Sequence, residues 1–108
     1  MEFKSQVNTT WKQSERLIAI GLKTETADCG LFYILGVQDG CAPKGETLPA
    51  WSLHRLMEIL HKGDIHGFVT IDVHNRNIES LYEIVIAKIE YLVKIKHFDV
   101  QYLEEQSV

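Results

Sequence analysis

The chain has 108 residues, of which 45% are hydrophobic and 24% are charged, and this balance is typical of a globular domain rather than of a disordered or fibrous chain. Its net charge of -4 argues against a protein that coats nucleic acid, because that affinity requires a surplus of Lys and Arg. No apolar run approaches the roughly 20 residues that span a bilayer, so we expect no membrane partner.

The length predicts a single domain over residues 1–108, with frayed ends at about 1–8 and 104–108. The amino terminus lacks the basic and apolar segments of a signal peptide, so we expect a cytoplasmic protein. Cys29 and Cys41 match neither a redox pair nor a zinc doublet, and we expect both to be free thiols.

The first predicted element is a helix from Thr10 to about Ile20. Thr10 and Gln13 are spaced as in a capping box, in which each side chain satisfies a backbone amide of the other residue. Gly21 then offers the left-handed residue that closes many helices, and Leu22 offers the apolar contact that accompanies it.

Residues 30–37 are rich in aromatic and aliphatic side chains and predict a buried strand. The turn sequence Gln38-Asp39-Gly40 follows and indicates a hairpin. Residues 41–48 predict a weak return strand, which Pro43 and Gly45 confine to an edge of the sheet.

A second helix is predicted after Ser52, which can cap it, and should end at Lys62-Gly63. Its apolar residues recur at helical spacing: Leu53, Leu56, Met57 and Leu60. Trp51 and Leu56 are spaced as a hydrophobic staple, which fixes how the chain enters the helix.

Residues 68–73 alternate between apolar and mainly polar faces and predict a half-buried strand. The longest predicted element is a helix that begins at Asn77 or Ser80 and continues to about Lys94. Its main apolar stripe is formed by Ile78, Leu81, Tyr82, Val85, Ile89, Leu92 and Val93.

Together these elements predict an α+β fold in which three helices pack on a small, mainly antiparallel sheet, with the long C-terminal helix at the centre. The residues predicted to form the core are Leu56, Leu60, Ile71, Val85, Ile89 and Leu92.

Several short sequences occur together in this chain: Gly21-Leu22 followed by Thr26-Ala27-Asp28, then Leu48-Pro49-Ala50-Trp51-Ser52-Leu53, then a helix ending in Ile89-Glu90-Tyr91-Leu92. In these the chain resembles small uncharacterised proteins of gut-bacterial prophages and mobile elements, from about Thr10 to Leu103. Residues 48–53 are the most specific part of the resemblance. It implies no activity and supplies no catalytic residues. Those proteins have a longer hairpin after the second helix, so the shorter span from Asp64 to Asn77 leaves the number of strands open.

One motif suggests metal chemistry. Gly63-Asp64-Ile65-His66-Gly67 is similar to the first metal-binding motif of calcineurin-like phosphoesterases, but a helix precedes it and the downstream ligands of that family are missing. Asp72 and His74 share one face of the predicted strand, and with Asp64 and His66 they define an alternative function, a small metal-dependent hydrolase-like enzyme. Polar residues on the wet face of a strand explain the same pattern more simply. We therefore predict no metal, no cofactor and no catalytic residue.

The last helix carries a second apolar strip beside its main stripe. Ile84, Tyr91 and Ile95 recur at plus seven and plus four, and Lys88 lies between them. A sheet and a first helix that wrapped the long helix from both sides would also account for this strip. The leading hypothesis is a non-enzymatic protein that binds another protein, or a second copy of itself as a homodimer, through Ile84, Lys88, Tyr91 and Ile95. A role as a mobile-element accessory, or as a DNA-associated accessory protein, is suggested only by the resemblance.

Overall fold

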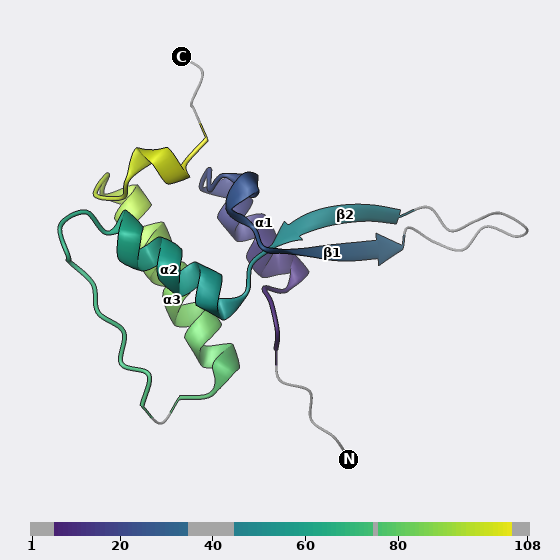
Figure 1. Ribbon diagram of the computed structural model, residues 1–108, viewed down its shortest axis with the longest axis horizontal. Helices are drawn as coiled ribbons and strands as arrows, with labels where there is room; N and C mark the ends of the chain where they lie inside the picture. The colour runs from purple at the N-terminus through teal and green to yellow at the C-terminus, as the bar shows by residue number, and fades with distance from the viewer. Residues whose placement is uncertain (1–5, 35–44, 75, 105–108) are drawn as a thin grey trace, which may run out of the picture.

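The computed structural model describes residues 6–34, 45–74 and 76–104. In these ranges the chain forms three helices and one two-stranded antiparallel sheet (Figure 1), which confirms the predicted α+β fold class. The elements are α1 (Trp11–Ala19), β1 (Cys29–Ile34), β2 (Gly45–Ala50), α2 (Leu53–Gly63) and α3 (Ile78–Lys94), with short 3-10 turns at Thr24–Thr26 and Val100–Tyr102. None of the described helices is long and apolar enough to cross a membrane.

The helix ends follow the local signals in the sequence. Thr10 and Gln13 form the expected capping box, since the Gln13 amide donates to Thr10 Oγ1 at 3.2 Å and the Thr10 amide donates to Gln13 Oε1 at 3.0 Å. Ser52 caps α2, and Asn77 rather than Ser80 caps α3. Gly21 has a φ of 91°, the left-handed conformation that ends α1 at little cost for glycine.

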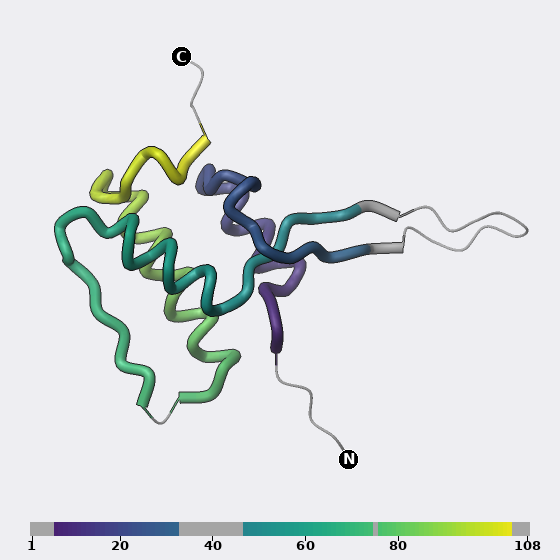
Figure 2. The backbone as a smooth tube through the Cα atoms, viewed as in Figure 1, coloured from purple at the N-terminus to yellow at the C-terminus, as the bar shows by residue number. Residues whose placement is uncertain are grey.

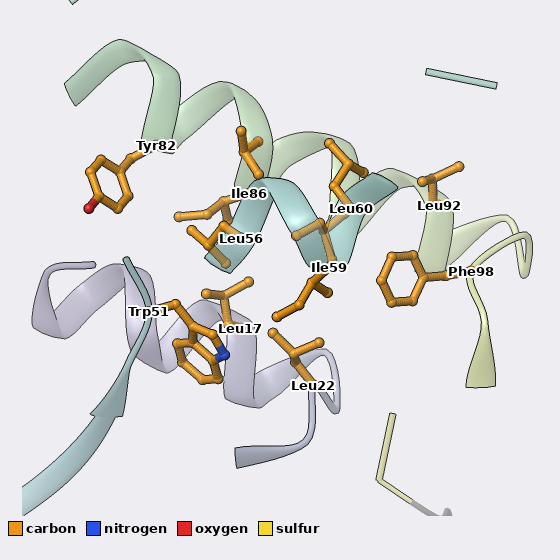
Figure 3. Close-up of a cluster of buried hydrophobic side chains, with 12 residues drawn as sticks. Leu17, Leu22, Trp51, Leu56, Ile59, Leu60, Tyr82, Ile86, Leu92 and Phe98 are labelled. Carbon is orange, nitrogen blue, oxygen red and sulfur yellow. The ribbon is translucent and has the colours of Figure 1, made fainter. Parts of the chain in front are cut away.

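The core lies where the three helices meet. The long helix α3 packs against both α1 and α2. Figure 3 shows side chains from these helices converging with Trp51, which is fully buried. Both members of the predicted staple, Trp51 and Leu56, belong to this cluster. The structure confirms five of the predicted core residues as buried: Leu56, Leu60, Val85, Ile89 and Leu92.

Ile71, the sixth predicted core residue, is only half-buried, although it packs against the core. The cluster instead includes Ile86, which is fully buried on α3.

The hairpin projects away from the helices (Figure 1), and β2 contacts α1 at the base of the hairpin. Its register pairs Cys29 with Ala50 at the base and Ile34 with Gly45 at the outer end. The prediction of a buried strand is wrong for β1, because Phe32 is 62% exposed on the projecting ribbon. The predicted turn at 38–40, Leu35 to Val37 of the first strand and Cys41 to Lys44 of the second lie outside the described residues.

No strand forms at 68–73, so this prediction was wrong. The alternation is visible in the burial only from 68 to 72, since Val69 and Ile71 are half-buried while Phe68, Thr70 and Asp72 are exposed. Val73, predicted on the same face as Val69 and Ile71, is exposed. Figure 2 shows this segment running beside the helices from the end of α2 to the start of α3, where no strand of the described chain pairs with it.

After α3 the chain turns back across the ends of the other helices (Figure 2). The turn places Lys96 at a φ of 60°, and isolated bridges then join Asp64 to Phe98 and Leu22 to Leu103. Gly63 lies so close to the ring of Phe98 that a Cβ atom on it would overlap the ring. The C-terminal segment thus contacts the carboxyl ends of both α1 and α2 through residues far apart in sequence.

Candidate functional site

The side of α3 that faces α1 is used for structure. The guanidinium of Arg16 on α1 donates to Glu83 at 2.9 Å and to Glu90 at 2.6 Å, and Gln13 donates to Glu83 at 2.6 Å. The hydrogen bond to Glu90, more than the one to Glu83, raises the pKa of Arg16, and burial opposes this shift only in part. The hydrogen bond from Gln13, assisted by Arg16, lowers the pKa of Glu83. Side chains of α1 therefore cover this side of α3.

The second apolar strip lies about 100° further around α3, because each of Ile84 and Tyr91 follows one of these glutamates by one residue. Tyr91 is 54% exposed, whereas Ile84 and Lys88 are half-buried. Ile95 is also half-buried and packs against the core cluster. The four predicted partner-binding residues thus differ in exposure: Tyr91 is exposed to solvent, whereas Ile95 is partly buried against the core.

Two small residues share the open part of this surface. Ser80 and Ala87 are exposed and lie four residues before Ile84 and Tyr91, respectively. We call the four positions Ser80, Ile84, Ala87 and Tyr91 the outer face of α3. The prediction from sequence missed Ser80 and Ala87 because neither is strongly apolar. The spacings between the four positions, of four, three and four residues, are nevertheless the signal of a shared helix face.

The structure does not bring the four residues of the metal hypothesis to one centre. The carboxylate of Asp64 accepts hydrogen bonds of 2.9 Å from the amides of Phe68 and Val69, and so holds the turn after α2. Asp72 and His74 contact each other at 3.1 Å on an exposed surface. The hydrogen bonds from the amide and the ring of His74 lower the pKa of Asp72. Among the described residues no three His, Cys, Asp or Glu side chains come together as a metal site would require.

His66 belongs to an aromatic group instead. Its ring lies 5.3 Å from the ring of Phe68 and 4.8 Å from that of His97, between centroids. The rings of Phe68 and His97 are also 4.8 Å apart. This group joins the segment after α2 to the end of α3, so the main contacts of His66 are structural.

Two open grooves flank the helices. The first, of about 500 Å³, lies between α2 and residues 67–71, and its titratable lining groups are His61 and Asp64. The second, of about 590 Å³, lies between the ends of α1 and α3 and the C-terminal segment, where Lys23, Lys96 and Glu104 line it. In neither groove do the lining residues combine a nucleophile with a positioned base, the arrangement that hydrolysis by covalent catalysis requires.

Trp51 is a structural residue rather than a binding anchor. It is fully buried, and its indole nitrogen donates to Thr26 Oγ1 at 2.9 Å. Its backbone pairs with Thr9 through two hydrogen bonds. The carboxylate of Asp28 accepts from the amide and the hydroxyl of Ser52 at 2.8 and 2.6 Å. Two of the short sequences behind the family resemblance, residues 26–28 and 48–53, therefore meet in this network.

The only cysteine among the described residues, Cys29, is a free thiol as predicted. Burial and the neighbouring carboxylate of Asp28 raise its pKa. A thiol with a raised pKa is mostly protonated at neutral pH, and a protonated thiol is a poor nucleophile.

Comparisons of the chain with protein-family models, with curated proteins and with solved structures found no match.

Proposed function

We propose that this protein is non-enzymatic and acts by binding another protein through the second apolar strip of α3, formed by Ile84, Lys88, Tyr91 and Ile95. The observation that carries the proposal is the exposure of Tyr91. Its side chain is 54% exposed on a helix whose opposite side forms the centre of the core. The buried residues of α3 fix the backbone that carries Tyr91, so binding through this residue costs little backbone entropy.

The chemistry of the outer face fits a protein partner. Its four residues, Ser80, Ile84, Ala87 and Tyr91, carry no charge, and interface centres are depleted of charged residues. Tyrosine is among the residue types most enriched at interface hot spots. Lys88 lies at the margin of this face, where its aliphatic stem can cover apolar surface while its ammonium stays in water.

The alternative function, a metal-dependent hydrolase using Asp64, His66, Asp72 and His74, has weaker support, because Asp64 and His66 are engaged in contacts that hold the segment after α2. A DNA-associated role has only the resemblance to proteins of mobile elements behind it, and the net charge of -4 disfavours it. A mobile-element accessory that binds protein is compatible with the proposal.

The proposal is tested by changing Tyr91 to Glu, which places a charge at the middle of the strip. Light scattering from micromolar to millimolar protein measures self-association of the 12.4 kDa chain. A photoreactive side chain at position 91, in cells, detects any other protein partner. We expect an assembly or a crosslink that depends on position 91.

The matched control is Val100→Glu, which changes another exposed apolar residue, 76% exposed, away from the strip. Association that Tyr91→Glu abolishes and Val100→Glu leaves intact supports the proposal. A strict monomer over the whole range, together with no crosslink from position 91, would overturn it.

A further inference from the structure

We infer that the groove between the ends of α1 and α3 binds a free long-chain carboxylate, such as a fatty acid, with its head group on Lys23 and Lys96. This is the groove of about 590 Å³ beside the C-terminal segment. None of the described residues that line it belongs to the outer face of α3, so the inference does not depend on the proposed function. It rests on the apolar lining of the groove, its preformed wall, its charges and the backbone of Lys96.

The groove has the size and the lining of a ligand site. Such sites typically have volumes of about 300 to 1,000 Å³, mostly apolar walls and a few polar groups that orient the ligand. Phe98 is buried, whereas the other apolar lining residues keep part of their surface open to the groove or to solvent. The apolar side chains that line it are Ile20, Val93, Phe98, Val100 and Leu103. They offer an alkyl chain a surface on which to leave water.

One wall of the groove is held in place by the fold itself. The Lys23 amide donates to the carbonyl of Tyr102 at 2.8 Å, and the Glu104 amide donates to the carbonyl of Gly21 at 2.6 Å. These backbone groups are therefore not free to pair with a bound peptide. A peptide brings polar backbone groups that are costly to bury without partners, whereas an alkyl chain brings none. The wall thus favours an alkyl chain over a peptide.

The charges of the groove fit a single carboxylate. Its charged side chains are Lys23, Lys96 and Glu104, so two positive charges and one negative charge leave a net charge of about +1 at pH 7. Within the described part of the chain neither lysine forms an ion pair. A carboxylate carries one negative charge, whereas a phosphate monoester carries about 1.5 to 2 at pH 7. The balance of charges therefore favours the carboxylate.

The backbone of Lys96 adds an independent reason to assign a role to its side chain. Its φ is 60°, in the left-handed region where glycine is the usual residue after a helix. The turn is otherwise complete, since the amides of Lys96 and His97 donate to the carbonyls of Val93 and Leu92 at 3.1 and 2.9 Å. Glycine would form this turn with less strain. Strain of this kind is concentrated at functional sites, and here the strained residue lines the groove.

The test is isothermal titration calorimetry with sodium dodecanoate below its micelle concentration. We expect saturable one-to-one binding to the wild type. Acetate, which is the head group alone, and dodecyltrimethylammonium, which has the same chain and a positive head, are expected to show no such binding. Lys23→Gln and Lys96→Gly should each weaken dodecanoate binding about two- to fivefold, which is the effect of one partly exposed ion pair.

Two further variants control for charge, and one measurement controls for folding. Glu104→Gln should strengthen dodecanoate binding, because it removes the negative charge of the groove. Lys12→Gln, on the exposed surface of α1, should leave the affinity unchanged. Lys96→Gly should raise the midpoint of urea unfolding because it relieves the strained φ, so its weaker binding cannot be a result of unfolding.

Three outcomes would overturn the inference. The first is the absence of saturable dodecanoate binding to the wild type. The second is an affinity that Lys23→Gln and Lys96→Gly leave unchanged, which would place the ligand elsewhere. The third is binding to vesicles of phosphatidylglycerol without binding to monomeric dodecanoate, which would assign the groove to a membrane surface.

Discussion

The indole nitrogen of Trp51 donates a hydrogen bond of 2.9 Å to the hydroxyl oxygen of Thr26, a residue 25 positions earlier in the chain, and both residues are buried. The same hydroxyl donates to the carbonyl of Lys23 at 2.6 Å. Thr26 therefore connects the turn after α1 to the start of α2, next to the base of the hairpin.

Replacing Thr26 with Val keeps the shape of the side chain but removes both hydrogen bonds. It leaves the Trp51 indole nitrogen buried without a partner, which typically costs about 1–3 kcal/mol of unfolding free energy. Urea denaturation followed by tryptophan fluorescence measures the loss. Thr26→Ser, which retains the hydroxyl, should lose less. Equal stability of Thr26→Val and the wild type would contradict the role given to this hydrogen bond.

Ile89 is fully buried at the centre of α3, whereas Ile84 on the same helix is only half-buried. Ile89→Ala is expected to lower the unfolding free energy by about 2–5 kcal/mol, because it leaves a cavity in the core. Ile84→Ala removes the same atoms from a partly open position and should cost clearly less in the monomer. Chemical denaturation at low protein concentration compares the two, and similar losses would argue against this assignment of the core.

Asp28 should make stability depend on pH at the acidic end. Partial burial raises its pKa, but the hydrogen bonds from the hydroxyl and amide of Ser52 outweigh that effect and lower the pKa below its usual value. The carboxylate therefore stabilises the fold fully above its unfolded pKa of about 3.9, and this contribution is lost as the pH falls through the lower folded value.

The measurement is the unfolding free energy of the wild type and of Asp28→Asn at pH 7 and at pH 3. The wild type is expected to be the more stable at pH 7, and the difference should shrink at pH 3. A difference that is the same at both pH values would assign the effect of the substitution to packing rather than to charge.

We predict that no metal is held at Asp64, His66, Asp72 and His74. Zinc or manganese added to the untagged protein should leave the melting temperature unchanged, because Asp64 already accepts two backbone hydrogen bonds. Metal retained near one equivalent after purification, and lost in Asp72→Ala, would show the prediction to be wrong.

The sequence by itself determined where α1 and α2 begin and end, and it limited the start of α3 to two candidate caps, Asn77 and Ser80. Thr10, Ser52 and Asn77 each accept a hydrogen bond from an amide three residues ahead, and Gly21 supplies the positive φ at the end of α1. These signals act within one turn of helix, so they do not depend on the rest of the chain. The spacing that defines the strip of Ile84 and Tyr91 is equally local.

Only the tertiary structure decided which strands pair and which side chains are covered by other elements. The alternation at 68–73 correctly predicts that Val69 and Ile71 face inward, although Val73 is exposed. A strand also needs the backbone of a partner strand, and the pattern carries no information about where that partner lies. The aromatic and aliphatic residues around Phe32 are typical of a buried strand. Phe32 is nevertheless exposed, because the hairpin projects away from the helices.

The same limit applies to the candidate site. The contacts of Arg16 with Glu83 and Glu90 join residues 67 and 74 positions apart, and they decide which side of α3 is covered by α1. That Tyr91 is open while Ile95 packs on the core follows from this placement of whole elements. Helical spacing determines which residues share a face, whereas long-range packing determines which face remains exposed to solvent.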